Sequence, residues 1–313
     1  MALLRCAVIG VGYLGKFHAQ KYAKIPECQL VAVVDSRQEQ ADAVAAPLNC
    51  AALTDYRDLL GKVDAVSIVV PTQGHYDVCA EFLRAGVHVL VEKPMTTTLA
   101  QADELIRLAK EHHCVLAVGH LERFNPAALA LEPLLSDPRF IDSSRLAPFK
   151  PRATDVSVLL DLMIHDVDLI LSLVDSELES VDCSGARVLT SDIDIANARI
   201  RFANGCVANV TASRVSAKSE RKMRVFQSQA CHSLDFQART LTTYRGTTHS
   251  QAEPEQSIER HEQSFGEADP LFSEILDFVN SIRNKRPPKV SGEAGRRALE
   301  AVQRITEATR LIS

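Results

Sequence analysis

A glycine-rich hexapeptide, residues 10–15, separates an apolar run at residues 5–9 from helix-compatible residues at 16–23. In a strand, turn and helix of this kind, the first glycine permits the tight turn, the second lets the backbone approach a pyrophosphate, and the third lets the helix pack on the strand. The amino-terminal end of the helix then faces the anion. The sequence therefore predicts a dinucleotide-binding turn, whose cofactor-binding residues are Gly10, Gly12, Tyr13, Leu14 and Gly15.

A carboxylate stands at the end of the next apolar run. Residues 29–34 form that run, and Asp35 follows it, twenty residues after Gly15. A carboxylate in this place accepts hydrogen bonds from the 2′-hydroxyl of an adenosine ribose and repels a 2′-phosphate. The sequence therefore favours NAD as the cofactor. NADP stays open, because Arg37 follows two residues later and could bind a phosphate.

Short apolar runs and helical patterns keep alternating through the first part of the chain, which predicts a doubly wound parallel sheet. A chain of 313 residues with 46% hydrophobic content can bury two cores, since single cores stop growing near about 250–300 residues. We therefore expect an NAD-binding Rossmann domain at residues 1–119 and a substrate and oligomerisation domain of α+β type at residues 120–313. Further strands of the first domain are expected at residues 64–70, 87–91 and 115–118, and helices at residues 77–83 and from 99 onward.

A charged pair, Glu92 and Lys93, directly follows the apolar run at residues 87–91, and a proline comes next. The carboxyl ends of parallel strands border the ligand crevice of an open α/β sheet. The proline cannot extend the sheet, so it ends the strand and directs the lysine out of the layer. Lys93 is therefore predicted to reach a substrate. Thr72 and His75, in the loop after the preceding strand, are expected to border the cofactor at the same edge.

Residues 157–174 form a helical pattern that is apolar almost all round, so this helix is expected to be largely buried. Asp161, His165 and Asp168 nevertheless recur at positions i, i+4 and i+7, which places them on one face. Burying ionisable groups is costly unless they are paired or hydrogen-bonded. The stripe predicts either a ligand-filled cleft or a structural Asp/His pair that locks the helix to a neighbour.

The second half of the chain changes to a hydrophobic period of two, which predicts an antiparallel sheet with one face on the helix at 157–174 and the other face free. A large free sheet face indicates a subunit interface, so a homodimer or homotetramer is expected. Residues 247–266 lack periodicity and predict a loop, and residues 294–311 predict a closing helix. The strands are expected at residues 181–189, 195–202, 207–213, 222–228 and 233–236.

Composition excludes several functional classes. The net charge is −5 with 24% charged residues, so nothing invites nucleic acid or an anionic membrane surface. No stretch has the pattern of a signal peptide or of a membrane span. The eight cysteines are scattered without a CxxC pair, so we expect reduced thiols, a cytoplasmic location and no bound metal. A loose basic cluster of Arg145, Lys150 and Arg152 is either a contact for a substrate phosphate or a solvated loop.

The chain resembles the Gfo/Idh/MocA family of NAD(P)-dependent oxidoreductases in four places. They are the glycine-rich turn, the tripeptide Glu92-Lys93-Pro94, the pair Asp161 and His165, and the closing segment 288–293. The resemblance covers essentially the whole chain. It implies a Rossmann domain followed by an open-faced antiparallel sheet domain. It also implies that Lys93, Asp161 and His165 meet a substrate hydroxyl beside the nicotinamide. We expect the nicotinamide itself to lie near Glu92, Thr72 and His120.

Within the family, residues 119–126 and 160–166 resemble the sugar-nucleotide branch. The similarity is strongest to members that oxidise the 3-hydroxyl of UDP-N-acetylglucosamine ahead of an aminotransferase, in the synthesis of a 2,3-diamino sugar for lipid A. The resemblance implies a sugar-nucleotide substrate, whose additional contacts would be Arg123, Asn125, Lys150 and Arg152. Two alternatives stay open: a dehydrogenase of another sugar, a UDP-uronate or a polyol, and a non-catalytic NAD-sensing regulator on the same fold.

A base that titrates near neutrality suits alcohol oxidation, which favours His165, with Asp161 orienting its ring. Lys93 would then stabilise the developing alkoxide through a preorganised charge. The opposite assignment also stays open. Near a cationic nicotinamide, Lys93 could have a lowered pKa and act as the base itself.

Overall fold

The computed structural model describes residues 2–149, 157–246 and 258–312. The chain forms two compact units. The first contains Met1–Leu121 together with Asp269–Arg296, and the second contains Glu122–Ala268 together with Arg297–Ser313. These units differ from the expected domains in one respect, because the segment 269–296 joins the first unit instead of the second.

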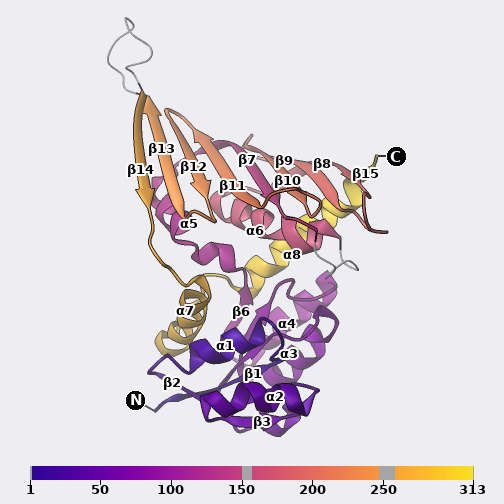
Figure 1. Cartoon of the computed structure of the whole chain (residues 1–313), viewed down its shortest axis with the longest axis vertical. Helices are drawn as coiled ribbons and strands as arrows, with labels where there is room; N and C mark the ends of the chain where they lie inside the picture. Colours follow the sequence, from indigo (N-terminus) through magenta and orange to yellow (C-terminus); the bar gives the residue numbers. More distant parts are fainter. Residues whose placement is uncertain (1, 150–156, 247–257, 313) are drawn as a thin grey trace, which may run out of the picture. The chain divides into compact units, whose positions relative to one another are not determined.

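The first unit is built on a six-stranded parallel sheet with strand order β3-β2-β1-β4-β5-β6 (Figure 1). This order is that of a Rossmann fold, in which the chain starts at the centre of the sheet and winds outward in both directions. The predicted doubly wound sheet is therefore confirmed. Its strands are β1 (Leu4–Ile9), β2 (Cys28–Val34), β3 (Ala51–Leu53), β4 (Ala65–Ile68), β5 (His88–Glu92) and β6 (Leu116–Gly119), and its helices are α1 (Gly15–Tyr22), α2 (Gln38–Ala45), α3 (His75–Arg84), α4 (Leu99–Glu111) and α7 (Pro270–Asn284).

Local sequence explains where these elements begin. Every residue of β4 is buried, as expected for a parallel strand covered on both faces. The hydroxyl oxygen of Thr98 accepts the backbone N–H of Gln101 at 3.3 Å, and the Gln101 side-chain oxygen accepts the N–H of Thr97 at 3.3 Å. This reciprocal cap fixes the start of α4.

Helix α7 belongs to the first unit because its apolar face completes that unit's core. Leu271, Ile275 and Phe278 recur at helical spacing and pack in one cluster with residues such as Val8 and Tyr22. Helix α7 also contacts α1. The late segment 269–296 is therefore an integral layer of the Rossmann unit.

The second unit is built on a nine-stranded sheet with the order β14-β13-β12-β11-β7-β10-β9-β8-β15. Most neighbouring pairs are antiparallel, but β10 pairs in parallel with β7, and β15 pairs in parallel with β8. Its strands are β7 (Pro138–Leu146), β8 (Leu178–Ala186), β9 (Ile195–Phe202), β10 (Val207–Ser213), β11 (Glu220–Gln227), β12 (Ala230–Asp235), β13 (Thr240–Gly246), β14 (Ile258–Ser264) and β15 (Thr309–Leu311).

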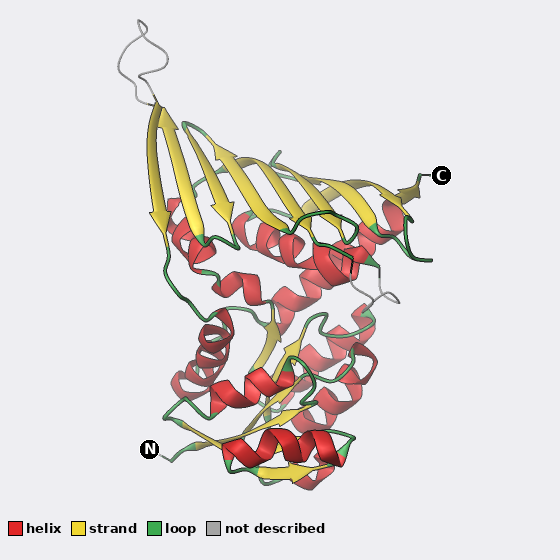
Figure 2. Ribbon diagram, viewed as in Figure 1, coloured by secondary structure: helices red, strands yellow, loops and turns green. Residues whose placement is uncertain are grey.

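The helices of this sheet lie on one of its faces (Figure 2). They are α5 (Pro126–Leu131), α6 (Ile164–Leu173) and α8 (Gly292–Ala308), and a π-helical segment, Leu159–Met163, directly precedes α6. Strand β9 shows the resulting alternation, since Ala196, Ala198, Ile200 and Phe202 are buried while the residues between them are exposed. In the described residues, no helix covers the opposite face of the sheet.

Several expectations for the second unit are wrong in detail. Strands β7 and β13 were not predicted, although β7 lies in the middle of the sheet. Strand β14 occupies part of the expected loop 247–266, whose first residues lie outside the described ranges. Residues 309–311, expected as helix, form β15. The strand expected at 181–189 ends at Ala186.

Among the described residues, no helix is both long and apolar enough to span a membrane. All eight cysteines have free thiols, as the sequence predicted.

Candidate active site

The glycine-rich turn leaves room for an anion. Gly10 has a φ of +85°, and a Cβ atom there would lie 2.7 Å from the carbonyl oxygen of Val69. A Cβ atom on Gly15 would lie 1.9 Å from the carbonyl oxygen of Gly10, so only glycine allows this contact between turn and helix. Gly12 has no atom within 4 Å of its Cβ position, so the space above it is open. These three positions fit the pyrophosphate of a dinucleotide.

Asp35 closes the turn from the neighbouring strand. Its Oδ2 accepts the backbone N–H of Val11 at 3.2 Å, and its Oδ1 accepts the N–H of Arg37 at 3.1 Å. The Arg37 guanidinium lies 3.8 Å from the same carboxylate, in an exposed position. The carboxylate is therefore fixed at the carboxyl end of β2, where an adenosine ribose would be bound.

A cavity of about 900 Å³ opens beside Gly10, Gly12 and Asp35. Its size suits a cofactor, since ligand sites span about 300–1,000 Å³. The sequence analysis missed part of its lining, because those residues carry no motif of their own. They are Ser36, Thr54, Asp55, Tyr56 and Arg57. Two residues predicted to bind the cofactor, Tyr13 and Leu14, are not part of this lining. Tyr13 is 71% exposed and packs edge-on against Phe17, and Leu14 is half-buried.

His75 is buried and bridges two segments of backbone. Its Nε2 lies 2.8 Å from the carbonyl oxygen of Val70, and its Nδ1 lies 2.9 Å from that of Pro94. Burial lowers the pKa of His75, and its contacts with these carbonyls only partly oppose that effect. Thr72, in the turn before it, is half-buried. His75 therefore fastens the cofactor-facing loop to the segment that follows Lys93.

Lys93 directly follows β5, and the Lys93–Pro94 peptide bond is cis. Glu92 Oε2 accepts the backbone N–H of Lys93 at 3.2 Å, and Glu92 Oε1 lies 3.2 Å from Nε2 of the buried His18. Burial alone would raise the pKa of Glu92, but the hydrogen bond with His18 and the attraction of Lys93 leave that pKa below its ordinary value. The sequence analysis missed His18. It could have been found as a polar side chain on the buried face of α1.

Gly119 and Glu274 also lie close to the Glu92 carboxylate. A Cβ atom on Gly119 would lie 2.8 Å from Glu92 Oε1, so the carboxylate packs directly against the end of β6. His120, which follows that strand, is buried. Glu274 of α7 brings a second carboxylate within 4.8 Å of His18 and Glu92. The expectation of a metal-free protein stays a prediction.

In the second unit, Asp161 lies in the π-helical segment and His165 in the first turn of α6, and both residues are half-buried. Such π-helical turns are frequent at functional sites. Asp168, the third residue of the predicted stripe, has a structural partner. It is buried, with its carboxylate 3.8 Å from the Arg123 guanidinium, which also donates a hydrogen bond to its backbone oxygen at 3.4 Å.

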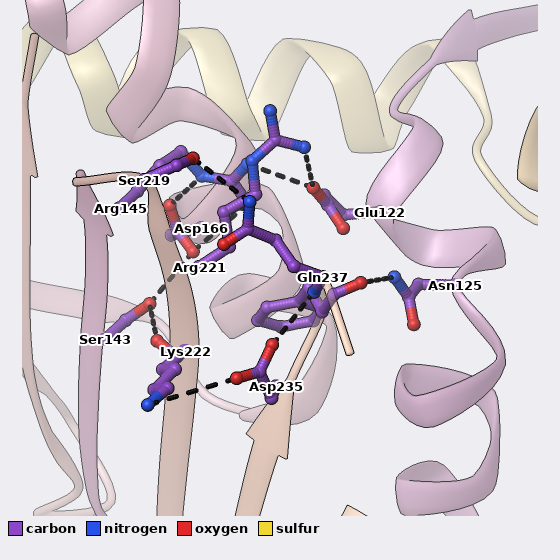
Figure 3. A network of polar contacts seen from close by, with 11 residues as sticks. Glu122, Asn125, Ser143, Arg145, Asp166, Ser219, Arg221, Lys222, Asp235 and Gln237 are labelled. Atoms are coloured by element: carbon purple, nitrogen blue, oxygen red, sulfur yellow. Dashed lines mark hydrogen bonds and ion pairs between the residues drawn. The ribbon is translucent and has the colours of Figure 1, made fainter. Parts of the chain in front are cut away.

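A buried ionic network lies beside His165 in sequence (Figure 3). The Arg145 guanidinium donates to Asp166 Oδ2 at 2.6 Å and to Glu122 Oε1 at 2.9 Å. Ser143 donates to the other oxygen of Asp166 at 2.9 Å. The two carboxylates raise the pKa of Arg145, although burial opposes them. Arg145 is thus a core residue, and its expected place in a solvent-facing basic cluster is wrong.

The predicted substrate residues have mixed surroundings. Asn125 caps α5 by accepting the N–H of Ala127 at 3.1 Å, and it donates one amide N–H to the carbonyl oxygen of Phe236 at 3.2 Å. Arg123 contacts Asp168, as described above. Lys150 and Arg152 lie outside the described residues. The meeting of Lys93 with Asp161 and His165 on one substrate stays a prediction.

Known proteins resemble this chain along its whole length. Residues 4–120 match the model of the oxidoreductase family with an NAD-binding Rossmann fold, and residues 137–233 match that of the GFO/IDH/MocA C-terminal domain. The chain is 44% identical over 307 residues to UDP-N-acetylglucosamine 3-dehydrogenase of Acidithiobacillus ferrooxidans, with 97% of each chain covered. A solved structure of the enzyme of that name from the same organism has a TM-score of 0.92 at 43% identity and covers 99% of this chain and 98% of that chain. Myo-inositol 2-dehydrogenase of Thermotoga maritima is 27% identical over 318 residues, which cover 95% of this chain and 93% of that protein.

Proposed function

This chain belongs to the Gfo/Idh/MocA family of NAD-binding oxidoreductases, and on that premise we propose that it oxidises the 3-hydroxyl of UDP-N-acetylglucosamine to the 3-keto sugar nucleotide. The observation that carries this proposal is the 44% identity, over 97% of both chains, to a relative named for that reaction. The glycine turn, Asp35 and the adjoining cavity support NAD as the cofactor. Bound NAD supplies the acceptor for the hydride that leaves C3.

The protein's own residues handle the proton of the reacting hydroxyl. His165 accepts it, because an imidazole titrates near neutrality and can take a proton and release it again. Asp161 orients that ring. Lys93 stabilises the negative charge that develops on the substrate oxygen. The reverse assignment, with Lys93 as the base, predicts the same products. The two assignments differ in whether a substitution of His165 or one of Lys93 abolishes the pH dependence of kcat.

The other predicted residues bind and orient. Asp35 holds the adenosine ribose and disfavours a 2′-phosphate, which makes NAD the preferred cofactor. Arg123, Asn125, Lys150 and Arg152 bind the sugar and the diphosphate, whose charge calls for cationic and amide donors. Residues that border the cofactor are Gly10, Gly12, Tyr13, Leu14, Gly15, Thr72, His75, Glu92 and His120.

We also propose three properties of the working enzyme. A 3-keto sugar is the natural substrate of an aminotransferase, so the product would feed the amination that yields a 2,3-diamino sugar for lipid A. The sheet face without helices would form the contact of a homodimer or homotetramer. Eight free thiols fit a reducing compartment, so the protein would act in the cytoplasm.

The test follows the absorbance of the reduced nicotinamide in a reaction that contains NAD and UDP-N-acetylglucosamine. A sugar aminotransferase and glutamate are added to remove the ketone, because alcohol oxidation by NAD is uphill near neutral pH. Wild type is expected to reduce NAD, and Lys93→Ala to lose turnover while it still binds NAD. Lys62→Ala, at an exposed lysine of the same unit, is the matched control and should keep its rate.

The same assay separates the rival functions. A signal with free sugars or polyols, and none with UDP-N-acetylglucosamine, would move the substrate to another class. Inhibition by UDP alone supports a nucleotide subsite. Absence of turnover with every alcohol, together with tight NAD binding, would support an NAD-sensing regulator. An active Lys93→Ala variant would contradict the proposed mechanism.

A further inference from the structure

Lys93 is held by its two neighbours in the chain, and each neighbour contacts a buried histidine. Glu92 accepts the backbone N–H of Lys93 at 3.2 Å and lies 3.2 Å from His18 Nε2. On the other side, the carbonyl oxygen of Pro94 lies 2.9 Å from His75 Nδ1. Both imidazole rings are 1% exposed. The main chain on either side of Lys93 is therefore anchored inside the first unit.

Each histidine belongs to a helix that begins where a cofactor-facing loop ends. His18 is the fourth residue of α1, which starts at the last glycine of the glycine-rich turn. His75 is the first residue of α3, which directly follows the turn Thr72–Gly74. Both contacts span the sequence widely, since 74 residues separate His18 from Glu92 and 19 separate His75 from Pro94. The two rings thus connect the loops expected to bind NAD with the backbone of the catalytic lysine.

The chemistry of the acceptors fixes which ring nitrogens carry hydrogen. Carboxylate and carbonyl oxygens only accept, so the nitrogen that faces them must be the donor. In His18 that nitrogen is Nε2, and in the described residues no partner lies within reach of its Nδ1. In His75 both nitrogens face carbonyl oxygens, Nδ1 that of Pro94 and Nε2 that of Val70. A neutral ring donates to one of the two carbonyls and a protonated ring to both, and the form with hydrogen on Nδ1 is the one that holds Pro94.

We propose that His18 and His75 are positioning residues, which act through Glu92 and Pro94 to hold Lys93 where its ammonium group meets the reacting hydroxyl. This inference rests on the proposed role of Lys93. Placement matters at this level, because a shift of about 1 Å in a catalytic group can cost about 100-fold in rate. Their polar contacts are with Glu92, Val70 and Pro94, so they act on Lys93 through the chain.

Amide substitutions can test the two hydrogen bonds separately. An asparagine places its NH₂ group near the position of the histidine Nδ1, and a glutamine places it near that of Nε2. At position 75, His75→Asn keeps the donor for Pro94, whereas His75→Gln keeps only the donor for Val70. At position 18, His18→Gln keeps the donor for Glu92, whereas His18→Asn loses it. The inference therefore predicts a crossed pattern, in which the shorter amide rescues one position and the longer amide rescues the other.

The experiment measures kcat, KM, the Kd for NAD and the thermal midpoint of all four variants with UDP-N-acetylglucosamine. His75→Asn and His18→Gln are expected within about fivefold of the wild-type kcat, and His75→Gln and His18→Asn about 30- to 100-fold below it. The Kd for NAD should change by less than about threefold in all four. Rescue by the same amide at both positions, a kcat that follows the thermal midpoint, or no loss of kcat would overturn the inference and leave the histidines a purely structural role.

A second readout does not depend on turnover. Lysines are methylated with ¹³C-formaldehyde and a borohydride reductant, and the Lys93 signal is assigned by its loss in Lys93→Arg. The NMR chemical shift of the methylated Lys93 should change in His75→Gln and His18→Asn and stay the same in the other two variants. An inactive wild type, or an active Lys93→Ala variant, would refute the proposed function, while the Lys93 signal would still decide the positioning role. A signal unchanged in all four variants would overturn it.

Discussion

Replacing Arg145 by methionine tests the ionic network of the second unit. Methionine keeps much of the side-chain length but leaves the Asp166 carboxylate, which is 1% exposed, without a guanidinium. Glu122, which is 9% exposed, keeps only the more distant Arg221 guanidinium at 3.8 Å. Removing one partner of a buried ionic group costs about 3–5 kcal/mol, because a buried charge is left uncompensated. For a unit of this size each kcal/mol lowers the thermal midpoint by about 2–4 °C. Arg145→Met should therefore lower the midpoint of the second unit by about 6–20 °C.

The assay is calorimetry at pH 7, with Arg139→Met as the matched control. Arg139 lies on the same strand and pairs with Asp137 at 2.7 Å, but these side chains are 69% and 52% exposed. Exposed pairs contribute about 0–1 kcal/mol, so the control should lose no more than about 4 °C. Adding Asp166→Asn to Arg145→Met removes the stranded charge and should recover part of the loss. Equal shifts for Arg145→Met and Arg139→Met would refute the reasoning, because burial would then make no difference.

Two further variants test the carboxylate at the cofactor turn and the carboxylate of Asp194, in the connection between β8 and β9. Asp35→Asn should lower the ratio of kcat/KM with NAD to kcat/KM with NADP by about tenfold or more, because about 1.4 kcal/mol of charge repulsion corresponds to a factor of ten. Initial rates with both cofactors measure this ratio, and an unchanged ratio would contradict the expectation. Burial would raise the pKa of Asp194, but the N–H groups of Thr190, Leu189 and Val188 hold it at about 2. Because the folded pKa lies below the unfolded value of 3.8, Asp194 stabilises the fold above that pH, and its contribution is lost as pH falls toward 2. Asp194→Asn should lower the thermal midpoint at pH 7 and weaken its dependence on pH between 3.8 and about 2; an unchanged pH profile would exclude this role.

The Rossmann unit is predictable because its signals are local. A parallel strand covered on both faces is a short continuous apolar run, as in β4. The turn after β1 needs glycine at position 15 because a Cβ atom there would meet Gly10 of the same hexapeptide, and at position 10 because φ is +85° there. Asp35 follows its strand directly. Each of these features can be identified without knowing what packs against it.

Strand β7 shows why the second unit is harder to predict. Its inward-facing positions include Ser143 and Arg145, and Asp142 and Ser144 on the other face are polar too, so the alternation of apolar and polar residues is lost where the network of Figure 3 lies. The carboxylates that compensate the buried charge of Arg145 belong to Asp166 and Glu122, which lie in other segments of the chain. Strand β14 carries no apolar signal at all, because every one of its residues is exposed and backbone pairing with β13 defines it.

The site shows the same limit. Sequence spacing places Asp161, His165 and Asp168 on one helical face, but it does not show that Asp168 is buried against Arg123. His18 acquires its role from Glu92, 74 residues later. Residue types at strand ends indicate where chemistry occurs, whereas the residues that hold them in place depend on contacts that only the folded chain defines.

The place of α7 in the first unit has a consequence for synthesis on the ribosome. Residues 1–121 emerge early, but Leu271, Ile275 and Phe278, which cover part of their core, are made more than a hundred residues later. Until then, apolar groups around Val8 and Tyr22 lack their cover, in a cell where exposed apolar surface promotes aggregation. The usual order, in which an amino-terminal domain finishes folding before the next one emerges, therefore does not hold for this chain. The nascent chain therefore exposes part of the core of its first unit until α7 has been made.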